Sequence, residues 1–173
     1  VWFGHCAGFL GLVRAVEDLC VARAGPPERG VVWLGQQKDC GLDRPVETWI
    51  TCRMTHIAAL EVMRRGDGAA HLRPLLDVGH DALTGRLRDH ESRGWLPAVG
   101  GTAPQPTDKV AYAHAFVILA AASLTAAGHP GGPALLTEAL DGFDHYFWDP
   151  DAGPARGHTQ LTGARGEEHR GRK

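Results

Sequence analysis

The stretch RPVETWITCRMTHIAAL, residues 44–60, decides the fold class of this chain. Its apolar side chains recur every three or four residues and do not alternate with a period of two, so the spacing predicts a helix. Pro45 suits a first helical turn and Gly66 suits an end, which places this helix over residues 45–65. We expect its core face to be a stripe of five apolar residues, namely Val46, Ile50, Met54, Ile57 and Leu60.

A second stripe on the same helix is chemically unusual, because Trp49, Arg53 and His56 share it at helical spacing. A guanidinium that borders a core needs either a partner carboxylate or a solvated cavity. Two interpretations follow from the spacing. Either Arg53 is paired with a structural Asp or Glu and Trp49 only packs, or the two line a sugar pocket, in which an indole covers the C–H side of a ring and a guanidinium donates to its oxygens.

Helical periodicity continues along most of the chain and predicts an all-α fold. Short and long connections alternate between the helices, which favours stacked αα-hairpins. Asp108 is a candidate N-cap, and the long connection over residues 91–107 is expected to be functional or mobile. The further helices are expected at residues 5–23, 68–88, 108–127 and from Pro133 onward.

Stripes on these later helices predict which sides face the core. On the third helix the stripe is Leu72, Leu76, Gly79, Leu83 and Leu87, and on the fifth it is Leu136, Leu140, Phe143 and Phe147. On the fourth helix the shared face is Lys109, Tyr112, Phe116, Leu119 and Ser123. Tyr112 is therefore expected on the core side, whereas His114 points elsewhere and is expected to pack between helices.

Composition limits the function classes. The 173 residues suit one domain, and the formal net charge of -2 gives no basic field for nucleic acid and no sign of a membrane surface. No stretch has the length and hydrophobicity of a membrane helix. The scattered histidines lack metal-ligand spacing, and no cofactor motif is visible, so we expect neither a metal nor a cofactor. The four cysteines lack paired spacings and predict free thiols in a reducing, cytoplasmic compartment.

Four segments together resemble the N-acylglucosamine 2-epimerase family, closest to its mannose isomerase and sulfoquinovose isomerase branch. They are LDRPVETWITCRMTHIAAL, LTGRLRDHESRGW, DKVAYAHAFVILAAASLTAAGHPGGPALLTEAL and FWDPDAG, which span residues 31–153 with their surroundings. The resemblance implies an (α/α)6 toroid of twelve helices around a pocket. It also implies aldose–ketose isomerisation or C2 epimerisation of a mannose-like monosaccharide, by proton transfer through an enediol or enediolate.

The resemblance also implies roles for individual residues. Trp49, Arg53 and Tyr112 match substrate-binding positions, and Arg53 would act in catalysis by stabilising the oxygen charge that develops as the α-carbon loses its proton. His56 and His114 belong to the matching motifs, but neither is assigned the proton transfer.

The match to that family is expected to be partial. Residues 1–152 correspond to about five of the twelve helices of the toroid, and residues 153–173 are expected to be a disordered tail, read out of frame. The N-x-N-M-H helix and the later acid/base histidines of the family are not found. This chain is therefore expected to be a truncated and inactive part of an isomerase.

Two other functions stay open. A non-catalytic helical fragment or interaction module would expose its inner helix faces and self-associate. A glycoside hydrolase on a related toroid would need two carboxylates that flank the scissile bond. The available acids form no convincing pair, being Glu47, Glu61, Asp108 and Glu138.

Overall fold

A computed structural model describes residues 45–102, 105, 108–149, 153–154 and 158–159. The helix expected over residues 5–23 and most of the tail expected to be disordered lie outside the described residues. Within them, the expectation of an all-α fold is confirmed.

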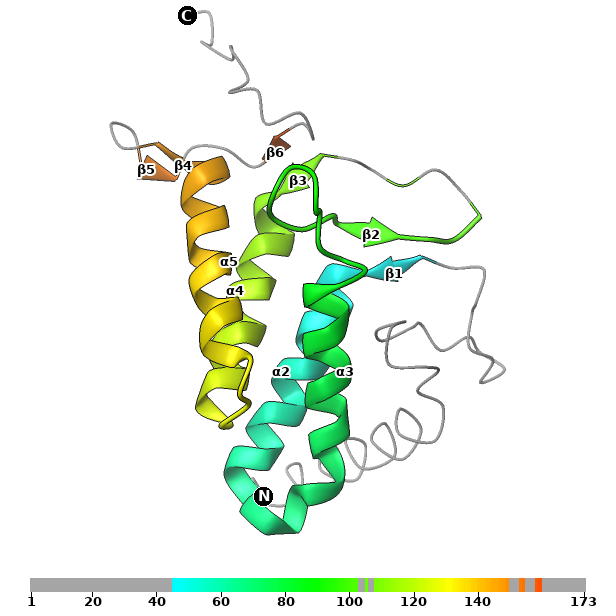
Figure 1. The fold of residues 1–173 in the computed structure, drawn as a ribbon, viewed down its shortest axis with the longest axis vertical. Helices are drawn as coiled ribbons and strands as arrows, with labels where there is room; N and C mark the ends of the chain where they lie inside the picture. The colour runs from blue at the N-terminus through cyan, green and yellow to red at the C-terminus, as the bar shows by residue number, and fades with distance from the viewer. Residues whose placement is uncertain (1–44, 103–104, 106–107, 150–152, 155–157, 160–173) are drawn as a thin grey trace, which may run out of the picture.

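The described helices form two antiparallel αα-hairpins, α2 with α3 and α4 with α5 (Figure 1). Helix α2 packs against both α3 and α4, and α4 packs against both α2 and α5. Helices α2 and α4 begin at the same end of the molecule. The helical elements are α2 (Thr48–Arg65), the 3-10 helix η2 (Gly66–Leu72), α3 (Arg73–Thr84), α4 (Ala111–Ala126) and α5 (Gly132–Phe147).

Helix ends follow local chemistry in most places. Gly66, with a φ of 56°, ends α2, and Pro74 lies in the first turn of α3. Gly85 ends α3, so this helix stops before the expected residue 88. The expected N-cap at Asp108 is wrong, because α4 begins three residues later, behind Val110. Residues 109 and 110 are extended and pair with another strand instead of continuing the helix.

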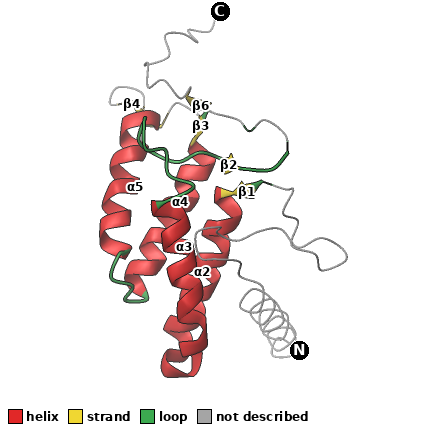
Figure 2. Ribbon diagram, turned by 45° about the vertical axis from the view of Figure 1, so that its right-hand side comes forward, coloured by secondary structure: helices red, strands yellow, loops and turns green. Residues whose placement is uncertain are grey.

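Three short antiparallel ribbons lie at the end where α2 and α4 begin, as Figure 2 shows in yellow. They pair β1 (Val46–Glu47) with β2 (Ala98–Val99), β3 (Lys109–Val110) with β6 (His158–Thr159), and β4 (Trp148–Asp149) with β5 (Gly153–Pro154). An isolated bridge joins Arg88 to Trp95. The long connection over residues 91–107 is thus tied to the helix ends in its first half.

The core side of α2 differs from the predicted stripe. Val46 is buried as expected, but Leu60 is 47% exposed, and Ile50, Met54 and Ile57 are only half-buried. Small side chains fill the interface instead, because α2 and α3 approach closely: a Cβ on Gly79 would lie 1.9 Å from the Thr55 hydroxyl oxygen. The buried residues of α2 are Thr48, Thr51, Cys52, Thr55, Ala58, Ala59, Glu61 and Val62.

Of the other two predicted core stripes considered next, one is confirmed and one is not. The stripe of the third helix is confirmed, since Leu72, Leu76, Gly79, Leu83 and Leu87 are all buried. On α5 the prediction is wrong by about one position, because the helix turns Leu135, Ala139, Gly142 and Tyr146 inward. Leu140 is 46% exposed as a result, although Phe147 is buried as expected.

Two further expectations concern the compartment. In the part of the chain that the structure describes, no helix combines the length and hydrophobicity that a membrane span requires. Cys52 is a free, fully buried thiol, and burial raises its pKa. A thiol in that state is chemically inert. The other three cysteines lie outside the described residues.

Candidate functional site

A stripe of partly exposed side chains runs along α2. Its members are spaced four, three, four and three residues apart, so they lie within a narrow arc of the helix surface. Leu60 and Met63 are 47% and 43% exposed, and they lie one helical turn apart. We call these five residues, Trp49, Arg53, His56, Leu60 and Met63, the α2 stripe.

Arg53 stacks on Trp49 within the α2 stripe. The guanidinium carbon lies 5.5 Å from the centroid of the indole, which is a cation–π arrangement. The indole N–H donates to the Glu47 carboxylate. Arg53 is exposed, and among the described residues it has no carboxylate partner. The interpretation of Arg53 as one half of a structural ion pair therefore finds no support in this part of the chain.

The exposed side of α4 carries Tyr112, which corrects the expectation that this side chain joins the core. Tyr112 is 57% exposed and meets Phe116 edge-on, with ring centroids 4.9 Å apart. Smaller residues occupy the core side, again because the helices pack closely. They are Ala113, Val117, Ala120, Ala121 and Leu124. We call Tyr112, Phe116, Leu119 and Ser123 the α4 stripe, in which Tyr112 and Leu119 are exposed and Ser123 is buried.

A hydrogen bond joins the two stripes. His56 Nδ1 lies 2.7 Å from Ser123 Oγ. At about 100° per residue, Trp49 is only about 20° around α2 from His56, and Tyr112 is about 20° around α4 from Ser123. Trp49, Arg53 and Tyr112 therefore lie on one side of the α2–α4 pair, which we call the open face.

Helix geometry also sets the height of each residue on the open face. Helices α2 and α4 run in the same direction (Figure 1), and His56 is level with Ser123. Trp49 and Phe116 each precede these residues by seven positions, or about 10 Å of rise. The indole of Trp49 is therefore level with the Phe116–Tyr112 ring pair. An arginine and aromatic groups from two helices thus gather near the end where both helices begin.

His114 lies on the buried side of α4, as predicted, and so does not belong to the open face. Its Nε2 accepts the Trp95 backbone N–H at 3.1 Å, so its Nδ1 must carry the proton that is donated to the Val110 carbonyl at 3.0 Å. Burial, with smaller contributions from Lys109 and Arg88, lowers the pKa of His114 to about 4. The imidazole is therefore neutral at physiological pH.

Residues missed by the sequence reasoning form a second polar cluster around the same loop. Lys109, fully buried, pairs with the Asp89 carboxylate, which also accepts the backbone N–H groups of Glu91 at 2.9 Å and Ser92 at 3.1 Å. Burial alone would raise the pKa of Asp89, but the hydrogen bonds from Lys109 and the two N–H groups outweigh it and lower that pKa. We call this group, together with His114 and Trp95, the anchored cluster.

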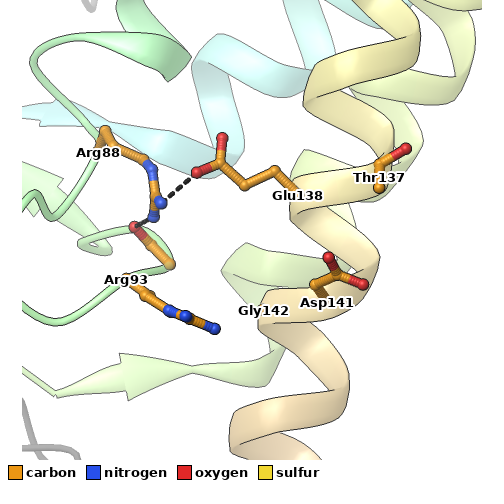
Figure 3. A pocket seen from close by; sticks show the side chains of 7 residues that line it. Arg88, Arg93, Thr137, Glu138, Asp141 and Gly142 are labelled. Carbon is orange, nitrogen blue, oxygen red and sulfur yellow. Dashed lines mark hydrogen bonds and ion pairs between the residues drawn. The ribbon is translucent and has the colours of Figure 1, made fainter.

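A pocket of about 270 Å³ lies beside the anchored cluster, because Gly94, the neighbour of Trp95, lines it. Figure 3 shows the side chains around this pocket. Arg88 pairs there with Glu138, donates to the Gly94 carbonyl at 2.8 Å, and lies 4.9 Å from the centroid of the Trp95 ring. Its charge is therefore already satisfied by the protein. The lining residues are Arg88, Arg93, Gly94, Thr137, Glu138, Asp141 and Gly142, and none of them belongs to the open face.

The acids considered for glycoside hydrolysis do not form a pair. Glu61 binds Arg64 and Arg65 on α2, whereas Glu138 on α5 binds Arg88 in the connection after α3. Glu47 accepts the indole N–H of Trp49. Across the residues with described positions, no group of three or more His, Cys, Asp or Glu side chains could hold a metal ion.

The architecture defines a class of protein: stacked αα-hairpins that form part of an (α/α)6 toroid, with an open face built by α2 and α4. The solved structure of cellobiose 2-epimerase from Spirochaeta thermophila DSM 6192 has the same fold, with a TM-score of 0.69 at 19% identity. The similarity covers 89% of this chain and 41% of that one. The sequence model for N-acylglucosamine 2-epimerase (GlcNAc 2-epimerase) matches residues 30–172, and the chain belongs to this family.

Two relatives are named D-mannose isomerase. The protein from Thermobifida fusca is 41% identical over 169 residues, which cover 96% of this chain and 40% of the relative. The protein from Pseudomonas cannabina pv. alisalensis is 35% identical over 150 residues, covering 87% of this chain and 35% of the relative. The chain thus spans about 40% of the relatives' length. The family match runs to residue 172, further than the motifs over residues 31–153 indicated.

Proposed function

We propose that this chain forms the substrate-binding portion of a sugar isomerase or epimerase that acts on a mannose-like monosaccharide. The reaction would move a proton between adjacent sugar carbons through an enediol or enediolate. The observation that carries the proposal is the hydrogen bond between His56 and Ser123, because it places Trp49, Arg53 and Tyr112 on one side of the α2–α4 pair. Family membership and the two D-mannose isomerases support the substrate class.

Each side chain on the open face suits one part of a sugar. The indole of Trp49 offers an apolar surface for the C–H side of a ring, and the phenol of Tyr112 both donates and accepts hydrogen bonds. Arg53 is held by its stack on Trp49, so its guanidinium is preorganised to donate to a hydroxyl or carbonyl oxygen. Donors aimed at an oxygen that gains charge stabilise an enediolate more than the starting sugar.

The proposal gives the proton transfer itself to residues outside the open face. A base for this step must be poised near neutrality, and histidine is the usual choice. His114 cannot act in this way, because both its ring nitrogens are engaged inside the core. We assign the base to the part of the relatives' length that this chain does not span, because the resemblance places the acid/base histidines there.

A chimera tests the proposal. The matching segment of the Thermobifida fusca D-mannose isomerase is replaced by this chain, and D-mannose turnover is followed in deuterated water. A working chimera should form the ketose and incorporate solvent deuterium at the carbon that receives the proton. Arg53→Ala in this chimera should lower kcat/KM at least tenfold, equivalent to about 1.4 kcal/mol. Arg73→Ala, at an exposed position on α3, is the matched control and should leave kcat/KM unchanged.

A folded but inactive chimera would contradict the proposal, and equal kinetics of Arg53→Ala and its control would remove Arg53 from the site. A folded chimera is one that gives a cooperative melting transition.

We also infer that the apolar part of the open face favours self-association of this chain. Leu60, Met63 and Leu119 are 47%, 43% and 39% exposed on the same side of the helix pair. Large contiguous apolar patches are rare on monomers and usually mark interfaces. Light scattering coupled to size-exclusion chromatography should find a dimer or larger species that Leu60→Glu reduces. A monomer at all concentrations would contradict this inference. A cytoplasmic location stays a prediction.

A further inference from the structure

The hydrogen bond between His56 and Ser123 has a direction that chemistry determines. A serine hydroxyl carries one proton, and Ser123 donates it to the Leu119 carbonyl at 2.7 Å. The same Oγ lies 2.7 Å from His56 Nδ1. The proton between these two atoms must therefore come from the imidazole, so Nδ1 carries the hydrogen and Oγ accepts it.

This tautomer leaves a lone pair on the other ring nitrogen. In a neutral imidazole protonated at Nδ1, Nε2 is an acceptor. Among the described residues, His56 Nε2 has no hydrogen-bond partner, whereas the Nε2 of His114, in the same tautomer, accepts the Trp95 backbone N–H. Both histidines are held through Nδ1, but only His56 presents an unused acceptor.

The position of His56 on the open face suggests what this acceptor binds. His56 is half-buried and lies about 20° around α2 from Trp49 and about 60° from Arg53. Arg53 can only donate hydrogen bonds, and the indole N–H of Trp49 is already donated to Glu47. A sugar hydroxyl is both a donor and an acceptor, so a hydroxyl that accepts from Arg53 still requires an acceptor for its own proton.

We infer that His56 Nε2 accepts a hydrogen bond from a hydroxyl group of the monosaccharide, and that Ser123 positions His56 by fixing its tautomer. This inference rests on the proposed function of the open face. It makes His56 a residue that selects for a hydroxyl, because a site with an acceptor left unpaired disfavours an analogue that lacks the donor.

Nuclear magnetic resonance of the 173-residue chain tests the inference with two independent reporters. Histidine side chains labelled with nitrogen-15 reveal the tautomer of each ring, and the signal absent from His56→Asn identifies His56. D-Mannose is then titrated while the ring nitrogens of His56 and the indole N–H of Trp49 are followed. The indole reports on the proposed function, and His56 reports on the further inference.

We expect the Nδ1–H tautomer in the free chain and a mannose-dependent shift of both reporters. His56→Asn places an amide near the Nδ1 position and can keep the bond to Ser123 while losing the acceptor, so it should weaken mannose binding by roughly two- to tenfold. Ser123→Ala removes the acceptor for Nδ1–H, so it should populate the second tautomer. The Ser123→Ala measurement keeps the inference testable if the asparagine variant does not fold.

Four outcomes would overturn the inference. An Nε2–H tautomer in the free chain contradicts it directly. A response at Trp49 without one at His56, or unchanged mannose affinity in folded His56→Asn, rejects the inference and leaves the proposed function intact. Silence of both reporters rejects sugar binding by this chain and the inference with it.

Discussion

The anchored cluster and the open face both hold charged and aromatic side chains near the beginning of α4, but they treat them differently. In the anchored cluster, Lys109 is fully buried and paired with Asp89, and His114 uses both ring nitrogens on the backbone. On the open face, Arg53 and Tyr112 are exposed, and Arg53 has no carboxylate partner among the described residues. Polar groups satisfied by the protein stabilise its fold, whereas the polar groups left available on the open face are those that the proposed sugar site would use.

This difference predicts that substitutions in the two regions change different quantities, namely the free energy of unfolding and the affinity for a sugar. Changes in the anchored cluster should alter the free energy of unfolding, because they leave buried groups without partners. Changes on the open face should alter sugar binding and leave stability nearly unchanged, because exposed side chains contribute little to it.

The largest effect is expected from Lys109→Met. The substitution keeps an apolar stem of similar length but leaves the Asp89 carboxylate buried without its cation, which destabilises by about 3–5 kcal/mol. Urea unfolding followed by circular dichroism measures the change. Lys109→Met combined with Asp89→Asn should recover part of the loss, because the buried charge is then removed. A loss below about 1 kcal/mol for the single variant would show that the pair does not anchor the loop.

The next largest effect concerns pH and His114. The pKa of His114 is about 4 in the folded chain and about 6.5 when unfolded. The unfolded state therefore binds more protons between these values, so stability should rise by about 3 kcal/mol from pH 4 to pH 6.5 and stay flat above. Urea midpoints across this range measure the rise. His114→Gln, which cannot titrate but can accept the Trp95 N–H, should flatten it, and an unaltered slope would assign the effect to other groups.

A smaller effect is expected at the contact between α2 and α3. Gly79→Ala would place its Cβ against Thr55, and overpacking of this kind destabilises by about 1–3 kcal/mol. Thermal unfolding should show a lower Tm, and Thr55→Ala in the same chain should relieve part of the loss by removing the hydroxyl and methyl groups that the new Cβ would meet. Equal stability of Gly79→Ala and the parent chain would mean that the two helices lie further apart.

The smallest effect on stability is expected from Tyr112→Phe. Tyr112 is 57% exposed and its ring meets Phe116 edge-on, a contact that the substitution keeps. The free energy of unfolding should change by less than about 0.5 kcal/mol. Affinity for D-mannose should nevertheless fall by a few fold, because the hydroxyl is lost. A large stability loss without any change in affinity would place Tyr112 in the core instead of the site.

Sequence patterns predicted the local features of this structure well. The helix ending at Arg65, the helix after Gly131 and the leucine stripe of α3 were foreseen, because helix breakers and apolar periodicity are local signals. The shared stripe of Trp49, Arg53 and His56 was foreseen for the same reason.

Other features depend on contacts between residues far apart in the sequence, and a single sequence does not reveal these contacts. The core side of α2 follows from the close approach of Gly79 to Thr55, which favours small residues over Ile50 and Met54. Asp89 and Lys109 form an ion pair, but the sequence around either residue gives no sign of its partner. The exposure of Tyr112 has a similar cause, because its own stripe looks as apolar as the buried side of α4.

The central claim, that the open face binds a sugar through Arg53 and Trp49, is tested most directly by titrating D-mannose into this chain. Three proteins are compared at equal concentration: the parent chain, Arg53→Ala and the matched control Arg73→Ala. The indole signal of Trp49 should respond in the parent and in the control with the same Kd, and the Kd of Arg53→Ala should rise at least tenfold while its Tm is unchanged. Identical titration curves for all three proteins would contradict the claim.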